Sequence, residues 1–152
     1  MVLMKIYIDA DGCPVVNLTV AMAKEYDLEV IIVKNYAHEI TSDYATVVTV
    51  DIAADSADYY IINKIQKGDI VVSQDYGVAA ITLAKEAICI TQNGLVISND
   101  NIDGLLHSRH MNQQLRKSKK HYSKIKKRTN QDNINFEHKL RGLITKKQDD
   151  PI

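Results

Sequence analysis

Six aspartates in this sequence of 152 residues stand at or just beyond the ends of short apolar runs: Asp9, Asp11, Asp51, Asp55, Asp58 and Asp75. The fourth and fifth of them are three residues apart, which places both on one face of a helix. Carboxylate oxygens are the ligands that Mg²⁺ and Mn²⁺ prefer, and crowded carboxylates repel one another unless a cation lies between them. The pattern therefore predicts a site for Mg²⁺ or Mn²⁺, with Asp9, Asp11 and Asp75 as its central residues.

Each aspartate taken alone has a simpler interpretation, because Asp is a preferred residue at the position that caps a helix N-terminus. Asp11 could cap a helix that begins near Pro14, and Asp55 or Asp75 could cap the helices that follow them. Independent caps need not fall at the same end of neighbouring strands, so the joint pattern favours the metal site. The sequence leaves both interpretations open.

The apolar runs predict strands, and the segments between them have the spacing of helices. Strands are predicted at Lys5–Asp9, Leu28–Val33, Thr46–Val50, Ile70–Val72 and Ala87–Thr91. Helices are predicted from Pro14 to Tyr26, over Ala54–Gln66 and over Ala79–Glu86. The pair Asn93-Gly94 is typical of a two-residue hairpin turn, which would bring Leu95–Ser98 back antiparallel at an edge.

This alternation predicts an α/β fold in three layers, with a mostly parallel sheet and helices on both of its faces. Four of the runs, Ile6–Ile8, Val30–Ile32, Val47–Thr49 and Ile70–Val72, are apolar enough to be strands buried on both faces. Ligands of open α/β sheets bind outside the carboxyl ends of the strands. The aspartates should therefore converge on that edge.

Charge divides the chain into an acidic body and a basic tail. Residues 1–104 hold 15 Asp and Glu against 6 Lys and Arg, whereas residues 105–152 hold 4 against 13. The length fits one domain, 1–152, with 105–152 as a basic helical extension within it. The tail is predicted to contain an amphipathic helix from Leu105, a polar break at Thr129–Asn135, a short helix from Phe136 to Ile144, and a frayed end.

The basic tail is a candidate for contact with nucleic acid, because Lys and Arg pair with backbone phosphates. The residues expected to make these contacts are Arg109, Arg116, Lys119, Lys120, Lys126 and Lys127. The alternative is a solvated helix face that offsets the acidic body, since Tyr122 is the only aromatic residue within the basic run.

Other classes of protein receive no support from the sequence. The two cysteines, Cys13 and Cys89, form no CxxC motif, and no cysteine and histidine stand at zinc-binding spacing. Cys13 is interpreted as a packing residue and not as a nucleophile. No basic segment and long apolar run of a signal peptide open the chain, and no apolar stretch reaches the length of a membrane span. The expected location is the cytoplasm.

Four blocks of the sequence resemble the signature blocks of the bacterial YaiI/YqxD family: YIDADGCPV at 7–15, DSADYYI at 55–61, GDIVVSQDYGVA at 68–79 and LLHSRH at 105–110. The resemblance implies a fold related to PIN-like nuclease domains. It also implies that Asp9, Asp11, Asp55, Asp58 and Asp75 lie where PIN-like nucleases hold Mg²⁺ or Mn²⁺. The chain departs from the family pattern at 126–130, where KKRTN replaces an expected glycine-proline step.

Three functions remain open from the sequence. The first is a Mg²⁺- or Mn²⁺-dependent nuclease that hydrolyses RNA or DNA, with Asp9, Asp11 and Asp75 as catalytic residues and RNA as the more expected partner. The second is a phosphatase of the haloacid dehalogenase type, with Asp9 as nucleophile and Asp11 as acid and base. The third is a nucleic-acid-binding module without catalysis. The first is the prediction that the combined motifs favour.

Overall fold

The computed structural model describes residues 4–53, 56–117 and 127–149, and within them six strands form one sheet. The strands are β1 (Lys5–Asp9), β2 (Glu29–Asn35), β3 (Thr46–Val50), β4 (Ile70–Val72), β5 (Ile88–Ile90) and β6 (Val96–Ile97). Their order across the sheet is β3-β2-β1-β4-β5-β6. All neighbours are parallel except β5 and β6, whose antiparallel pairing confirms the predicted edge hairpin.

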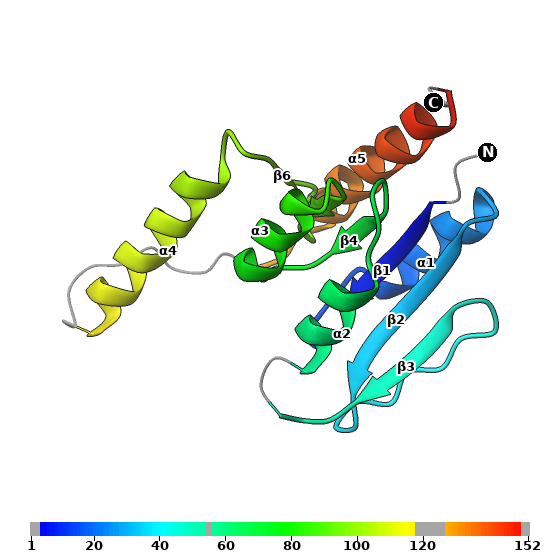
Figure 1. Cartoon of the computed structure of the whole chain (residues 1–152), viewed down its shortest axis with the longest axis horizontal. Helices are drawn as coiled ribbons and strands as arrows, with labels where there is room; N and C mark the ends of the chain where they lie inside the picture. Colours follow the sequence, from blue (N-terminus) through cyan, green and yellow to red (C-terminus); the bar gives the residue numbers. More distant parts are fainter. Residues whose placement is uncertain (1–3, 54–55, 118–126, 150–152) are drawn as a thin grey trace.

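Helices cover both faces of this sheet, which confirms the predicted three-layer α/β fold (Figure 1). They are α1 (Val16–Glu25), α2 (Ser56–Lys64), α3 (Tyr76–Ala84), α4 (Ile102–Lys117) and α5 (Asn130–Asp149). The first and last pack on one face, and α2 and α3 pack on the other. Figure 1 shows α4 extending beyond α3, away from the sheet. No helix in the described part of the chain combines the length and hydropathy needed to cross a membrane.

The central strands are apolar at consecutive positions because both of their faces are buried. Ile6 and Ile8 of β1 face the cluster under α1 and α5, while Tyr7 between them faces α2. The prediction of buried strands is confirmed for β1, β2 and β4. The Val47–Thr49 segment is a strand but is only partly buried, because β3 lies at the edge of the sheet.

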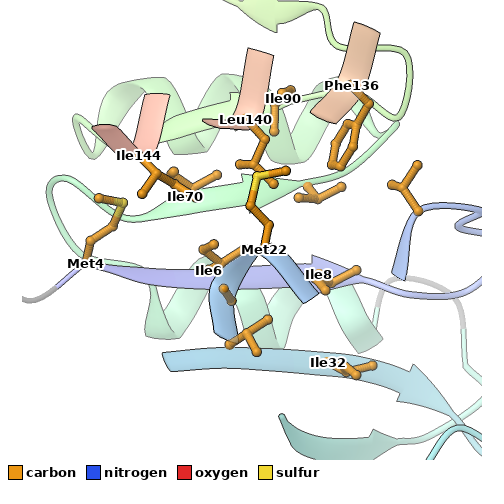
Figure 2. Close-up of a cluster of buried hydrophobic side chains, with 14 of the residues drawn as sticks. Met4, Ile6, Ile8, Met22, Ile32, Ile70, Ile90, Phe136, Leu140 and Ile144 are labelled. Carbon is orange, nitrogen blue, oxygen red and sulfur yellow. The ribbon is translucent and has the colours of Figure 1, made fainter. Parts of the chain in front are cut away.

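The largest buried cluster joins the last helix to the centre of the sheet (Figure 2). Phe136, Leu140 and Ile144 lie four residues apart, so they form one stripe on α5, and each is fully buried. They pack in the same cluster as Ile6 and Ile70 of β1 and β4. The end of the basic extension is therefore part of the main hydrophobic core.

Several helix starts differ from the prediction, since α1 begins at Val16 instead of Pro14 and α4 begins at Ile102 instead of Leu105. Helix α3 begins at Tyr76, three residues early, because Asp75 caps it. Helix α5 begins at Asn130, so the predicted polar break from Thr129 to Asn135 is wrong. Asp132 Oδ2 accepts the backbone N–H of Thr129 at 2.9 Å, which is one half of a capping box. The helix then continues to Asp149, beyond the predicted onset of fraying.

The turn between β5 and β6 lies against the start of α5. Gly94 has a φ of +87°, and a Cβ atom there would meet the carbonyl oxygen of Asn135 at 2.8 Å. Only glycine combines that dihedral angle with so close an approach. The predicted Asn-Gly turn therefore also fixes where the C-terminal helix docks.

Candidate carboxylate site

The carboxyl ends of β1 and β4 form the switch point of the sheet. From β1 the chain crosses first to β2 and β3 on one side, and later to β4 and β5 on the other. A crevice opens where neighbouring strands connect in opposite directions, and ligands of such folds bind there. Asp9 ends β1, and Ser73 and Asp75 follow β4, so the topology brings these three residues to the crevice.

Ser73 links the two strand ends. Its side chain is buried at 3% exposure, and its Oγ donates to Asp9 Oδ2 at 3.2 Å while accepting the backbone N–H of Asp75 at 3.1 Å. Ser73 was not among the predicted site residues. Its position immediately after a buried strand, matching that of Asp9, is the only signal in the sequence that could have identified it.

The carboxyl group of Asp9 is harder to ionise at this position than it would be in water. Burial raises the pKa of its carboxyl above the ordinary value, and the neighbouring charges of Asp11 and Asp75 raise that pKa further. The hydrogen bond from Ser73 lowers the pKa but does not offset the other effects. The carboxylate is therefore ionised at a cost in free energy that a bound cation would relieve.

Asp11 is not a helix cap, so that alternative is wrong for this residue. The N-cap residue of α1 is Val15, and no side chain accepts a hydrogen bond from the first N–H groups of this helix. Asp11 Oδ1 instead accepts the backbone N–H of Asn35 at 3.2 Å, and His38 Nε2 lies 3.8 Å away. Asp11 thereby spans from the loop after β1 to the end of β2.

Asp75 does cap α3, as the simpler interpretation proposed. Its Oδ1 accepts the N–H groups of Gly77 at 2.7 Å and Val78 at 3.2 Å. Its charge still raises the pKa of Asp9, so the two carboxyls lie within electrostatic reach. Asp75 therefore has a structural task, and it is not part of the lining of either hollow at this edge of the sheet.

Asp9 and Asp11 line two adjoining hollows at this edge. The inner hollow, of about 40 Å³, lies between β1 and β4, and its lining also includes Cys13, Ser73, Gln74 and Gln92. The outer hollow, of about 200 Å³, lies toward β3 and α2 and brings in Asn35, Asp51 and Asp58. The inner one has room for about one water molecule or ion, and the outer one for a larger polar group.

The donor set fits a hard divalent cation. Mg²⁺ is commonly held by one or two carboxylates, with water and substrate phosphates completing its coordination. Asp9 and Asp11 supply two carboxylates at one place, and Asp51 and Asp58 approach from the other side of the outer hollow. Within the residues that the structure describes, no three side chains of His, Cys, Asp or Glu are grouped closely enough to hold an ion by themselves.

Other acidic and thiol groups near these strands have structural surroundings. Buried Asp69, at the opposite end of β4, accepts backbone N–H groups from Lys5 at 3.1 Å and Gln66 at 2.8 Å. Burial raises the pKa of the Cys13 thiol, and it raises that of Cys89 to about 12. Because thiolates are the reactive form, neither cysteine is suited to be a nucleophile.

A separate groove of about 410 Å³ lies between α4 and the start of α3. It is lined by Arg109, Arg116 and several uncharged residues, and its lining contains no acidic residue. Gln74 lines both this groove and the inner hollow, so the two adjoin. Of the other predicted contacts, Lys127 is exposed, and four predicted site residues lie outside the described part of the chain: Asp55, Lys119, Lys120 and Lys126.

Replacing Asp9 by Asn should stabilise the metal-free protein at neutral pH by about 0.5–2 kcal/mol, because it removes a charge that the fold holds at a cost. The folded-state pKa of Asp9 is raised, so protonation favours folding. That favourable contribution is complete below the unfolded-state pKa and is lost as pH rises through the folded-state pKa. The advantage of the variant should therefore vanish in acid. Thermal unfolding in EDTA from pH 4 to 8 measures both effects, and a less stable variant at pH 7 would contradict the assignment.

Proteins of similar sequence match this chain along almost its whole length. The model of a family described as "Uncharacterized BCR, YaiI/YqxD family" matches residues 7–146. A UPF0178 protein of Alkaliphilus oremlandii is 52% identical over 137 residues, covering 90% of this chain and 88% of the relative. A UPF0178 protein of Exiguobacterium sibiricum is 46% identical over 146 residues, covering 96% and 100%. No solved structure matches the chain.

Proposed function

The chain belongs to the YaiI/YqxD family, and we propose that it is a nuclease that hydrolyses phosphodiester bonds with the help of Mg²⁺ or Mn²⁺. The observation that carries the proposal is the pair Asp9 and Asp11, which line two adjoining hollows at the switch point of a parallel sheet. The raised pKa of Asp9, caused by burial and then by neighbouring carboxylates, supports the need for a cation.

Some residues of the site would bind the cation, and others position the residues that bind it. Asp9 and Asp11 would hold the cation, with Asp51 and Asp58 bordering the outer hollow where substrate enters. A bound divalent cation supplies a water of lowered pKa and offsets negative charge on the phosphate. Ser73 orients Asp9, and the N–H of Asn35 orients Asp11, through the hydrogen bonds that each donates.

The groove beside α4 favours a polynucleotide over a small phosphate monoester. A monoester needs only the hollows, whereas Arg109 and Arg116 line a groove that adjoins the inner hollow at Gln74. Phosphates flanking the cleaved bond could pair with these arginines. The phosphatase alternative has less support, because phosphatases of that type also need a lysine placed to bind the phosphate. Lys34, near the end of β2, is buried, and its ammonium donates hydrogen bonds to the carbonyl oxygens of Asn35 and His38.

Hydrolysis of matched substrates tests the proposal. Single-stranded RNA, single-stranded DNA, duplex DNA and p-nitrophenyl phosphate would each be incubated with the protein in Mn²⁺, Mg²⁺ or EDTA. We expect slow cleavage of RNA or DNA that EDTA abolishes. Release of phosphate from the monoester without cleavage of any polynucleotide would favour the phosphatase, and binding without hydrolysis would favour the non-catalytic module.

Binding to nucleic acid should depend steeply on salt through the basic tail. Counterion release makes log affinity fall linearly with log salt, with a slope of about −0.7 to −0.9 per neutralised phosphate. Changing Lys119, Lys120, Lys126 and Lys127 to Gln should flatten that slope, by up to about three in total. Fluorescence anisotropy of a labelled oligonucleotide from 25 to roughly 300 mM salt measures it. An unchanged slope would indicate that these lysines offset the acidic body instead.

A further inference from the structure

Arg128, just before α5, is held by four hydrogen bonds to uncharged acceptors. Its Nε and Nη2 donate to Asn133 Oδ1 at 2.9 and 2.7 Å, its Nη1 donates to Asn93 Oδ1 at 2.8 Å, and its Nη2 donates to the Gln92 carbonyl at 2.8 Å. These contacts bridge the β5–β6 turn and the first turn of α5. The guanidinium is therefore fixed in position by two separate segments of the fold.

This position adjoins the carboxylate site. Gln92, whose carbonyl accepts from Arg128, lines the inner hollow together with Asp9 and Asp11. The backbone N–H of Gln92 in turn donates to Gln74 Oε1 at 2.8 Å. The positively charged guanidinium of Arg128 thus lies at the rim of a hollow that is lined by the carboxyl groups of Asp9 and Asp11.

The contacts of Arg128 leave its charge uncompensated. None of the described carboxylates forms an ion pair with it, whereas Arg141 of α5 pairs with Glu25 and Glu137. Four of its five N–H donors are used, which leaves one on Nη1. A clamp between two segments needs no net charge, since uncharged side chains could make the same kind of bonds. A fixed and unpaired guanidinium suits recognition of an anion.

We propose that Arg128 binds a phosphate of the nucleic-acid strand at the rim of the inner hollow, one that flanks the bond held at Asp9 and Asp11. The proposal rests on the proposed nuclease function for the identity of the anion. Arg109 and Arg116 line the groove that adjoins the hollow at Gln74, and Arg128 contacts the hollow through Gln92. Because Gln74 and Gln92 are hydrogen-bonded to each other, the arginines of the groove and Arg128 adjoin the hollow on the same side, which implies a substrate strand whose phosphates run along that side.

Oligonucleotide binding in EDTA tests this role without requiring catalysis. The probe is a labelled single-stranded RNA of about twelve nucleotides, titrated over a range of salt concentrations. Arg128→Gln removes the charge, Arg128→Lys keeps it, and Asn133→Ala removes two of the four clamp bonds while leaving Arg128 intact. We expect Arg128→Gln to weaken binding about tenfold and to reduce the salt slope by about 0.7. The slopes of Arg128→Lys and Asn133→Ala should stay at the wild-type value.

The outcomes separate this proposal from the nuclease function. If Asn133→Ala loses as much affinity and slope as Arg128→Gln, with the same fall in Tm, Arg128 is only a structural clamp. If wild type cleaves RNA but Arg128→Gln binds with an unchanged slope, the nuclease stands and this inference fails. If wild type binds through Arg128 but never cleaves, the inference stands and the nuclease fails. An absence of binding by wild type at low salt would overturn this inference, and hydrolysis in Mn²⁺ would then decide the nuclease function alone.

Discussion

Replacing Asp9 by Asn should reduce metal-dependent cleavage of RNA or DNA by at least about a hundredfold. A cation contributes several kcal/mol to stabilisation of the transition state, and each 1.36 kcal/mol is a factor of ten in rate. Asp9 lines both hollows and has its pKa raised by burial and by its acidic neighbours. It is therefore the ligand whose loss should cost most. Initial rates in Mn²⁺, with Mn²⁺ affinity measured by calorimetry, give both quantities.

Two other substitutions serve as controls for the Asp9→Asn variant. Asp100→Asn makes the same change of charge at an exposed turn and should cleave like wild type. Asp75→Asn isolates the charge of Asp75 from its capping role, because Asn and Asp cap helices about equally well. Because Asp75 lines neither hollow and acts on Asp9 only through its charge, we expect Asp75→Asn to lower the rate by less than about tenfold, with little change in Tm. Equal cleavage by wild type and Asp9→Asn would instead reveal a contaminating nuclease.

The convergence of carboxylates could be predicted because it follows from topology. Apolar runs that end in Asp9 and Asp51 become parallel strands, and the carboxyl ends of parallel strands meet at one edge. The role of Asp75 could not be predicted in this way. Whether its carboxylate turns toward Asp9 or toward the N–H groups of Gly77 depends on a side-chain rotamer, and the structure has the second arrangement. The spacing of residues carries no information about that choice.

The position of Arg128 could not be predicted from the sequence either. Its partners Asn93 and Gln92 lie 35 and 36 residues away in the chain, so their contacts depend on where α5 docks. In the sequence Arg128 is one of eight basic residues in a run, and nothing there separates it from the others. The short polar stretch before Phe136 predicted a break, yet the capping bond from Thr129 to Asp132 starts the helix there. The capping hydrogen bond at Thr129 therefore determined where α5 begins, although the polar composition of this stretch predicted a loop.

The docking of α5 gives the second large expected effect, which is on stability. Phe136→Ala should lower the free energy of unfolding by about 3–5 kcal/mol, because it leaves a cavity where a fully buried ring packs. At roughly 2–4 °C per kcal/mol for a chain of this size, Tm should fall by about 6–20 °C. Urea denaturation should give a lower midpoint with an unchanged slope.

Ile134→Ala is the matched control, since this residue stands two positions earlier on the same helix and is 49% exposed. It should change stability by less than about 0.5 kcal/mol. The comparison bears on the site as well as on the core, because Asn133 and Asn135 at the start of α5 contact Arg128 and Gly94. A loosened α5 should therefore also weaken RNA binding through Arg128, even though Phe136 touches no substrate. If Phe136→Ala unfolds like wild type, α5 is not docked on the sheet in solution, and the placement of Arg128 at the hollow falls with it.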